Sequence, residues 1–311
     1  MSLLEVNNLH TYFHTKRGVI KAVRGVSFSI DEGKTLGIVG ESGSGKSQTA
    51  ISILKLFESN QKIEKGTILF NNQNITDYSD KALQKIRGNE ISMIFQEPMS
   101  SLNPVFTVKK QISEVLIIHQ QMDKKQAEKK TLEMLRSVKI PNPERVMKLY
   151  PHQLSGGMSQ RVMIAMALAC NPKLLIADEA TTALDVIVQA EILKLMNELK
   201  STFNTAILFI THDLGVVSQM ADDVIVMYKG KVVEKAPVKT LFKDAKHPYT
   251  KRLLAAFLKT DIRSKKGEIK ETNLFEAENE KYNFRCFKED EEVDSDFLEV
   301  STGHFVACTV L

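Results

Sequence analysis

Short, uniformly apolar runs alternate along the chain with segments of helical periodicity. Four of these runs predict strands that are buried on both faces: 36–39, 91–95, 174–177 and 206–210. Helices are expected at 48–57, at 157–169, and where Val188, Ile192, Leu195, Met196 and Leu199 recur at helical spacing. The alternation of buried strands with helices predicts an α/β fold around a mainly parallel sheet.

Strands of another kind are expected near both ends of this pattern. Residues 3–9 and 26–30 alternate between apolar and polar positions, as half-buried strands do. Residues 224–228 and 231–234 flank Lys229-Gly230 and predict a hairpin. One or two further helices are expected at 237–259.

Two consecutive helical segments, 108–121 and 124–139, have no strand between them. They predict a helical insertion of about residues 104–171 within the α/β pattern. Beyond residue 259 the composition changes, because residues 260–280 are charged and poor in apolar side chains, which predicts a linker. Residues 281–311 follow as a C-terminal extension.

Composition narrows the class of protein. At 311 residues, with 43% hydrophobic and 26% charged residues, the chain is typical of a soluble globular protein. The net charge of +4 is too mild to indicate nucleic acid, and three scattered cysteines favour a reducing compartment. The first residues lack the pattern of a signal peptide, and the longest apolar run, 162–170, is shorter than the ~20 residues of a spanning helix. We expect a cytosolic protein that partners would hold at any membrane.

The strongest motif is a phosphate-binding P-loop between the strand at 36–39 and the helix at 48–57. Its glycines let several N–H groups converge on one phosphate at a helix N-terminus. Lys46 is expected to reach the β- and γ-phosphates, and Ser47 to bind Mg²⁺. The alternative is a Gly/Ser-rich turn without a ligand. The residues expected to contact the nucleotide are Gly40, Glu41, Ser42, Gly43, Ser44, Gly45, Lys46, Ser47 and Gln48.

Two carboxylates, Asp178 and Glu179, stand at the end of the apolar strand at 174–177. In a parallel sheet, ligands bind at the carboxyl ends of strands, where the P-loop also lies. Asp178 is expected to hold Mg²⁺ through water, and Glu179 is the candidate base that activates water against the γ-phosphate. The alternative is a carboxylate that caps the next helix.

A second glycine-rich turn, Ser155-Gly156-Gly157, opens the helix at 157–169. Its hydroxyl and exposed N–H groups form a second anion site. One chain needs only one phosphate cradle, so this turn is redundant unless it contacts a nucleotide held by another chain. The alternative is an ordinary helix start with Ser155 as its cap.

These motifs, with Gln96, the segment Ala183-Leu184-Asp185 and His212, resemble in their order the ATP-binding-cassette ATPase family. The resemblance implies a P-loop NTPase-type sheet with an N-terminal antiparallel β subdomain, and a nucleotide-binding domain over 1–259. By the same resemblance, Gln96 contacts Mg²⁺ or the attacking water and senses a membrane partner, Asp185 lies at a dimer seam, and His212 contacts the γ-phosphate.

An aromatic side chain is expected to stack on the adenine. Phe13 is the candidate for this role and Tyr12 the alternative, although an aromatic near a strand end is more often part of the core.

The resemblance narrows to the ATP-binding subunits of oligopeptide and dipeptide importers. Residues 96–104 and 154–169 carry it, with Met158 as in the D-type subunit, and the motif His247-Pro248-Tyr249-Thr250 resembles the start of that group's C-terminal extension. It implies ATP and Mg²⁺ as cofactors, a second ATPase subunit (F-type, or another copy), two permeases and an extracellular solute-binding protein, with no nucleic acid. Nickel, free or with a metallophore, is the alternative cargo.

Two other classes of function compete with an importer. Soluble cassette ATPases of translation or DNA maintenance usually have two cassettes or a long coiled coil, whereas this chain has one P-loop and no heptad run. A P-loop kinase or regulatory GTPase would leave Ser155-Gly156-Gly157 and His212 without a role.

The sequence departs from the family pattern at two places. Ala180 stands where proline is usual, which should affect local rigidity more than chemistry. The tail holds only Cys286 and Cys308, and an iron–sulfur cluster normally uses four ligands, so we expect no cluster. Cys170 is expected to be a small core residue.

Overall fold

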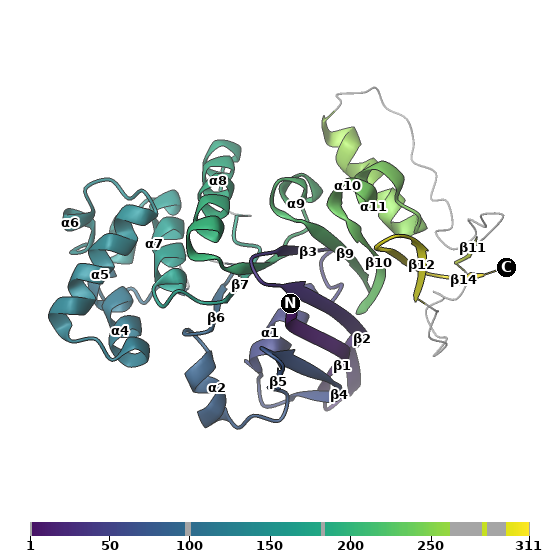
Figure 1. Ribbon diagram of the computed structural model, residues 1–311, viewed down its shortest axis with the longest axis horizontal. Helices are drawn as coiled ribbons and strands as arrows, with labels where there is room; N and C mark the ends of the chain where they lie inside the picture. Colours follow the sequence, from purple (N-terminus) through teal and green to yellow (C-terminus); the bar gives the residue numbers. More distant parts are fainter. Residues whose placement is uncertain (1, 97–100, 182–183, 262–281, 285–296, 311) are drawn as a thin grey trace.

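The computed structural model describes residues 2–96, 101–181, 184–261, 282–284 and 297–310. An eight-stranded sheet runs through the centre of the molecule, with helices α4 to α7 at one end and the C-terminal strands at the other (Figure 1). The predicted α/β fold is confirmed. Its strands lie in the order β12, β13, β10, β9, β3, β8, β7 and β6.

The strands β3 (Thr35–Val39), β8 (Ala206–Ile210), β7 (Leu174–Asp178) and β6 (Ile91–Ile94) run parallel, and β9 (Asp223–Tyr228) pairs with β3 in the same sense. Every residue of β3, β7 and β8 is buried. Alternate residues of β7 and β8 face two different cores, which is why these strands are apolar throughout rather than at every second position.

One of these cores lies under a second sheet. The antiparallel strands β1 (Ser2–Thr15), β2 (Gly18–Asp31), β4 (Gln61–Phe70) and β5 (Gln73–Asn74) form it, in the order β2-β1-β4-β5. The first two strands are much longer than the predicted 3–9 and 26–30. The pairing of β1 with β2 contains register shifts, which interrupt the alternation of apolar and polar residues. The sequence pattern therefore predicted only the part of each strand that contributes most to the core.

Helix α1 (Lys46–Leu54) starts and ends earlier than the predicted 48–57. Its first residue belongs to the P-loop. It ends at Leu54 because Lys55 adopts a left-handed conformation with φ 48°, and the N–H of Lys55 closes the last turn. Helix α2 (Asp80–Ile86) follows this sheet, with Ser79 as its cap.

The helical insertion packs against the other face of the parallel strands. It contains α4 (Val108–Gln120), α5 (Lys124–Ser137), the short α6 (Pro143–Val146), the 3₁₀ turn η1 (Pro151–Gln153) and α7 (Gly156–Leu168). Thr107 and Asp123 cap the two predicted helices. A core shared with α8 (Val186–Phe203) joins the insertion to the sheet. Cys170, just after α7, is buried as expected, with its Sγ 3.9 Å from the carbonyl oxygen of Val115 in α4.

Helices α9 (Leu214–Met220), α10 (Val238–Asp244) and α11 (Pro248–Asp261) cover the β9 end of the sheet. Among the described residues, no helix is both long enough and apolar enough to cross a membrane. The proposed linker at 260–280 lies almost wholly outside the described residues.

The C-terminal segment adds strands to the central sheet. Strand β13 (His304–Ala307) pairs antiparallel with β10 (Lys231–Pro237), and β12 (Phe297–Ser301) pairs with β13. Two further short strands, β11 (Tyr282–Asn283) and β14 (Thr309–Val310), pair with each other. Cys308 is buried, while Cys286 lies outside the described residues, so the absence of a cluster stays a prediction.

A buried pair joins β13 to β10. Nε2 of His304 lies 2.7 Å from Oε1 of Glu234, and both side chains are fully buried. The carboxylate of Glu234 also accepts hydrogen bonds from the backbone N–H groups of Lys246 and His247, at 2.7 and 3.1 Å. One carboxylate therefore connects the C-terminal strand, β10 and the start of α11.

Replacing His304 with alanine is expected to lower the free energy of unfolding by about 3 kcal/mol, because it leaves a buried carboxylate short of a partner. Urea denaturation followed by circular dichroism measures this loss. His14→Ala is the matched control, since His14 also lies 2.7 Å from a glutamate, Glu64, but half exposed. It should change the stability much less, and equal losses would contradict the assignment.

Candidate functional site

The P-loop connects β3 to α1 and wraps around the side chain of Lys46. Nζ of Lys46 donates hydrogen bonds to the carbonyls of Gly40 and Glu41, at 2.8 and 2.9 Å. A Cβ on Gly40 would lie 2.3 Å from the carbonyl oxygen of Met227, and one on Gly45 would lie 2.5 Å from that of Ala22. Both glycines also have positive φ, so the loop can only follow this path without side chains there.

Ser47 and Gln48 follow Lys46 in the first turn of α1. Oγ of Ser47 donates to Oδ1 of Asp178, at 3.0 Å, so the P-loop and the end of β7 meet as predicted. Nε2 of Gln48 is buried and has no hydrogen-bond partner among the described residues, which fits a side chain that awaits a ligand.

The pKa values of Lys46 and Asp178 differ from those of ordinary surface groups. Burial raises the pKa of Asp178 to about 6, against the hydrogen bond from Ser47. Burial also lowers the pKa of Lys46, although Glu179, Asp178 and Glu41 all oppose this. The half-buried hydroxyl of Ser47 and the buried carboxylate of Asp178 are hard oxygen ligands. Mg²⁺ is usually held by one or two such protein groups with substrate phosphates and water.

Glu179 lies beside two further predicted residues. Its backbone N–H donates to the carbonyl of Ile210 at 2.9 Å, and its φ of 47° turns the chain away from the strand direction. Nε2 of Gln96 donates to Oε2 of Glu179 at 2.8 Å, and Nδ1 of His212 lies 3.5 Å from Oε1. A left-handed glutamate is costly, and such strain concentrates at functional sites.

The predicted residues therefore gather at one edge of the sheet. The P-loop, His212 and Gln96 follow the carboxyl ends of the parallel strands β3, β8 and β6, and Asp178 is the last residue of β7, which lies between β8 and β6. Separate stretches of sequence become one site because parallel strands end at the same edge. Gln96 is the last described residue before the segment 97–100.

Comparison with known protein families identifies the family of the chain that carries this site. A family model described as "ABC transporter" matches residues 23–182, more than half of the chain. The chain belongs to the ABC transporter family. A second model, "Oligopeptide/dipeptide transporter, C-terminal region", matches residues 233–292. Both confirm the resemblance stated from the motifs, and as an ABC ATPase the chain uses ATP.

Curated ABC relatives resemble the chain over most of its length. The oligopeptide transport ATP-binding protein AppD of Bacillus subtilis is 56% identical over 277 residues, 89% of this chain and 83% of AppD. The oligopeptide transport ATP-binding protein OppD of Escherichia coli is 51% identical over 260 residues, 84% of this chain and 77% of OppD.

Solved ABC cassettes share the fold. A dimeric post-hydrolysis structure of the cassette MJ0796, bound to ADP and Pi, has a TM-score of 0.68 and 30% identity, and the match covers 76% of this chain and 98% of that one. CbiO1 of Clostridium perfringens, part of the transporter complex cbiONQ, has a TM-score of 0.67 and 28% identity, over 84% of this chain and 99% of that one.

The remaining ABC motif residues lie at helix starts. Oγ of Ser155 accepts from the N–H of Met158 at 3.3 Å and so caps α7, while Gly156 faces open space. Oδ1 of Asp185 accepts from the N–H groups of Ile187 and Val188 and caps α8. Ser155 therefore caps a helix, as the alternative interpretation stated. Its side chain is also exposed, so capping does not prevent contact with another chain. Ala183 lies outside the described residues.

One contact of the ABC site was missed by the sequence analysis. The hydroxyl of Tyr249, near the start of α11, accepts a hydrogen bond from the backbone N–H of Glu41 in the P-loop at 3.0 Å. The motif at 247–250 was visible in the sequence as a family resemblance. Nothing in its residue types indicated that it contacts a loop more than two hundred residues earlier.

Proposed function

We propose that this chain hydrolyses ATP to power an importer of oligopeptides or dipeptides. The observation that carries the proposal is the cluster of Glu179, Gln96 and His212 beside the P-loop, in a chain whose residues 233–292 match the peptide-transporter C-terminal region. A carboxylate held by an amide and an imidazole at a phosphate site is equipped to accept a proton from an attacking water.

Each residue of the site has a distinct part in hydrolysis. Lys46 and the N–H groups of residues 42–48 hold the phosphates, and Glu179 takes the proton of the attacking water. Gln96 orients that carboxylate from one side and His212 from the other, where His212 also reaches the γ-phosphate. Mg²⁺, when bound to Ser47, Asp178 and Gln96, would neutralise charge on the β- and γ-phosphates.

A second ATPase subunit completes the site in this proposal. Ser155, Gly156 and Gly157 present the N-terminus of α7 to solvent, and an exposed helix start suits the phosphates of a nucleotide held by another chain. Asp185 lies near this surface, at the start of α8. Two solved structures of one similar cassette, MJ0796, are described as dimeric. The partner is a different F-type subunit or, failing that, a second copy.

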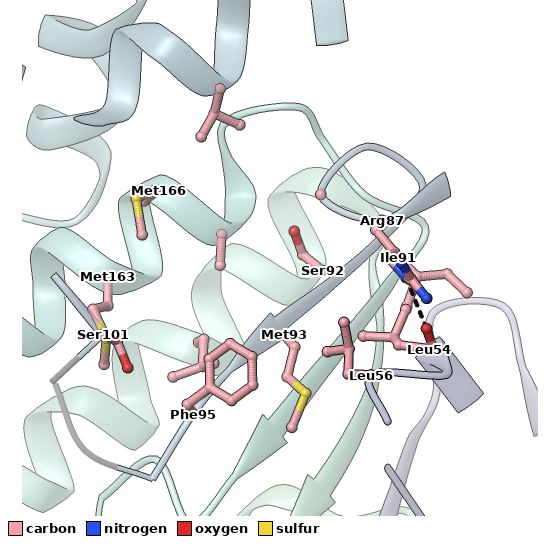
Figure 2. A pocket seen from close by; sticks show the side chains of 14 residues that line it. Leu54, Leu56, Arg87, Ile91, Ser92, Met93, Phe95, Ser101, Met163 and Met166 are labelled. Carbon is pink, nitrogen blue, oxygen red and sulfur yellow. Dashed lines mark hydrogen bonds between the residues drawn. The ribbon is translucent and has the colours of Figure 1, made fainter. Parts of the chain in front are cut away.

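An apolar pocket offers a place for a membrane partner next to Gln96. It has a volume of about 300 Å³ and lies between the N-terminal part and the helical insertion, lined by Leu56, Met93, Phe95, Met163 and Met166 among others (Figure 2). Phe95 is 45% exposed and directly precedes Gln96. A permease segment seated there would move the residue that contacts Glu179, which couples hydrolysis to transport.

Transport of peptides is the part of the proposal that is tested in cells. The chain would act at the cytoplasmic face of the membrane with two permeases and an extracellular solute-binding protein. Deleting its gene should abolish uptake of a labelled tripeptide, and the wild-type chain, but not Glu179→Gln, should restore uptake. Normal peptide uptake together with lost nickel uptake would favour the alternative cargo. Normal uptake of both would point to a cassette ATPase that does not transport.

Phe13 is the side chain proposed to stack on adenine, and its neighbours favour it over Tyr12. Tyr12 packs edge-on against His10, with ring centroids 6.1 Å apart, and its hydroxyl lies 3.2 Å from Nδ1 of His10. Thr11 faces α1, where its Oγ1 lies 2.8 Å from Oγ of Ser52. Since side chains alternate along a strand, Phe13 shares the face of Thr11, toward the helix that begins in the P-loop.

Phe13→Ala is accordingly expected to weaken ATP binding about 10-fold, because base–aromatic stacking is worth one to a few kcal/mol. Isothermal titration calorimetry with ATP measures the dissociation constant. Tyr12→Ala is the matched control and should leave it nearly unchanged. The reverse result would assign adenine to Tyr12.

A further inference from the structure

The start of α11 is anchored on the P-loop by a buried tyrosine. Tyr249 is only 2% exposed, and its ring packs against that of Tyr228 with centroids 4.5 Å apart. Its hydroxyl accepts the hydrogen bond from the backbone N–H of Glu41 at 3.0 Å. Because packing fixes the ring, the position of this hydroxyl is fixed as well.

The N–H that Tyr249 binds belongs to the peptide group between Gly40 and Glu41. The carbonyl of the same group is that of Gly40, which accepts the 2.8 Å hydrogen bond from Nζ of Lys46. In a trans peptide the N–H and the C=O point in opposite directions within one rigid plane. The tyrosine hydroxyl and the lysine ammonium therefore hold the two ends of a single peptide group.

Gly40 makes this peptide group easy to rotate. Its φ is 156°, and a Cβ there would lie 2.3 Å from the carbonyl oxygen of Met227, so no larger residue could stiffen the position. Glycine adjusts its backbone angles at little cost. Tyr249 supplies a contact from outside the loop that limits this rotation, because its hydroxyl holds the N–H of the same peptide group.

We propose that Tyr249 is a positioning residue for Lys46, which acts through the Gly40–Glu41 peptide group. The inference rests on the proposed role of Lys46 in binding the phosphates of ATP. With the peptide group fixed, the ammonium is already in place when the nucleotide arrives, and affinity gains from this preorganisation. The region that resembles peptide-transporter C-termini, residues 233–292, thus reaches the nucleotide site of its own chain.

Arg252 adds a weaker contact to the same loop. Its Nη2 lies 2.8 Å from Oε1 of Glu41, and its guanidinium lies 5.7 Å from the centre of the Tyr249 ring. Both side chains of the ion pair are about half exposed. Exposed pairs of this kind contribute little, so Arg252→Met should change ATP affinity less than Tyr249→Phe does.

The test is Tyr249→Phe, which keeps the buried ring and removes only the acceptor. The dissociation constant of ATP, measured by calorimetry on the full chain without Mg²⁺, should rise about threefold to tenfold, as expected for one hydrogen bond. In the assembled transporter KM for ATP should rise by a similar factor while kcat stays within about twofold, since uniform binding is lost. Tyr228→Phe, which removes the hydroxyl of the neighbouring ring, should leave both constants unchanged.

Three results would overturn the inference. They are an unchanged dissociation constant in Tyr249→Phe, an equal rise in Tyr228→Phe, or a fall in kcat without a rise in KM. Lys46→Ala separates this failure from that of the proposed function. If Lys46→Ala weakens ATP binding strongly while Tyr249→Phe does not, the lysine keeps its role and only the positioning by Tyr249 is wrong. If Lys46→Ala binds ATP normally, the role of Lys46 itself is wrong.

Discussion

Replacing Glu179 with glutamine is expected to lower the rate of ATP hydrolysis at least about 100-fold while ATP still binds. The amide is nearly isosteric and can still accept the hydrogen bond that Nε2 of Gln96 donates at 2.8 Å, so the local geometry should persist. It cannot accept a proton from water. With hydrolysis blocked, the nucleotide should stay between the two ATPase subunits and hold them together.

Phosphate release measures the turnover of this variant, and size-exclusion chromatography with ATP measures the trapped dimer. The dimer is sought both with the chain alone and with the F-type subunit present. Glu90→Gln is the matched control, because Glu90 is also a partly exposed glutamate, at 38% against 14% for the Glu179 side chain, but pairs with Lys173, at 3.2 Å. It should hydrolyse ATP normally. Wild-type turnover in Glu179→Gln would remove Glu179 from the role of base.

Lys46→Ala is expected to weaken ATP binding about 100-fold, because hydrogen bonds from a charged donor to phosphate are among the strongest in proteins. Lys46 is 4% exposed, and its ammonium is already directed into the P-loop by the carbonyls of Gly40 and Glu41. Removing it leaves these two carbonyls and the phosphates without their shared donor.

Lys55→Ala is the control for this second variant. Lys55 follows α1 and donates to two carbonyls as well, those of Thr76 and Tyr78, at 2.8 and 3.1 Å. Its loss should cost stability but leave the dissociation constant of ATP unchanged, as calorimetry would show. If both variants lose ATP affinity equally, the effect comes from a damaged fold and not from Lys46.

The fold could be predicted from the sequence wherever the residues of one segment are enough to indicate its structure. The apolar runs at β3, β7 and β8 could be recognised because both of their faces are covered. The helices of the insertion could be recognised because each is one continuous helical segment, which is a local pattern as well. The P-loop is likewise a local motif, and parallel strands then place it beside Asp178 and His212 without further information.

Contacts between distant segments could not be predicted in the same way. Strand β13 pairs with β10 through the Glu234–His304 pair, but neither residue has a pattern that indicates a buried partner. By its residue type, Tyr249 likewise cannot be told apart from any aromatic residue that packs at the start of a helix. Its role depends on the hydrogen bond between its hydroxyl and the N–H of Glu41. That bond forms because of how α11 packs against the P-loop, and the residues next to Tyr249 in the sequence do not indicate it.

The pairing of Glu234 with His304 also sets a delay during synthesis of the protein. The two residues are 70 positions apart, and chains are made at about 5–20 residues per second, so about 4 to 14 s separate them. During that time the edge of β10 lacks its neighbour β13 and the carboxylate lacks its imidazole. Unpaired strand edges invite association with other chains. Slow translation of the segment between the two residues would therefore lengthen the period in which a nascent chain can aggregate.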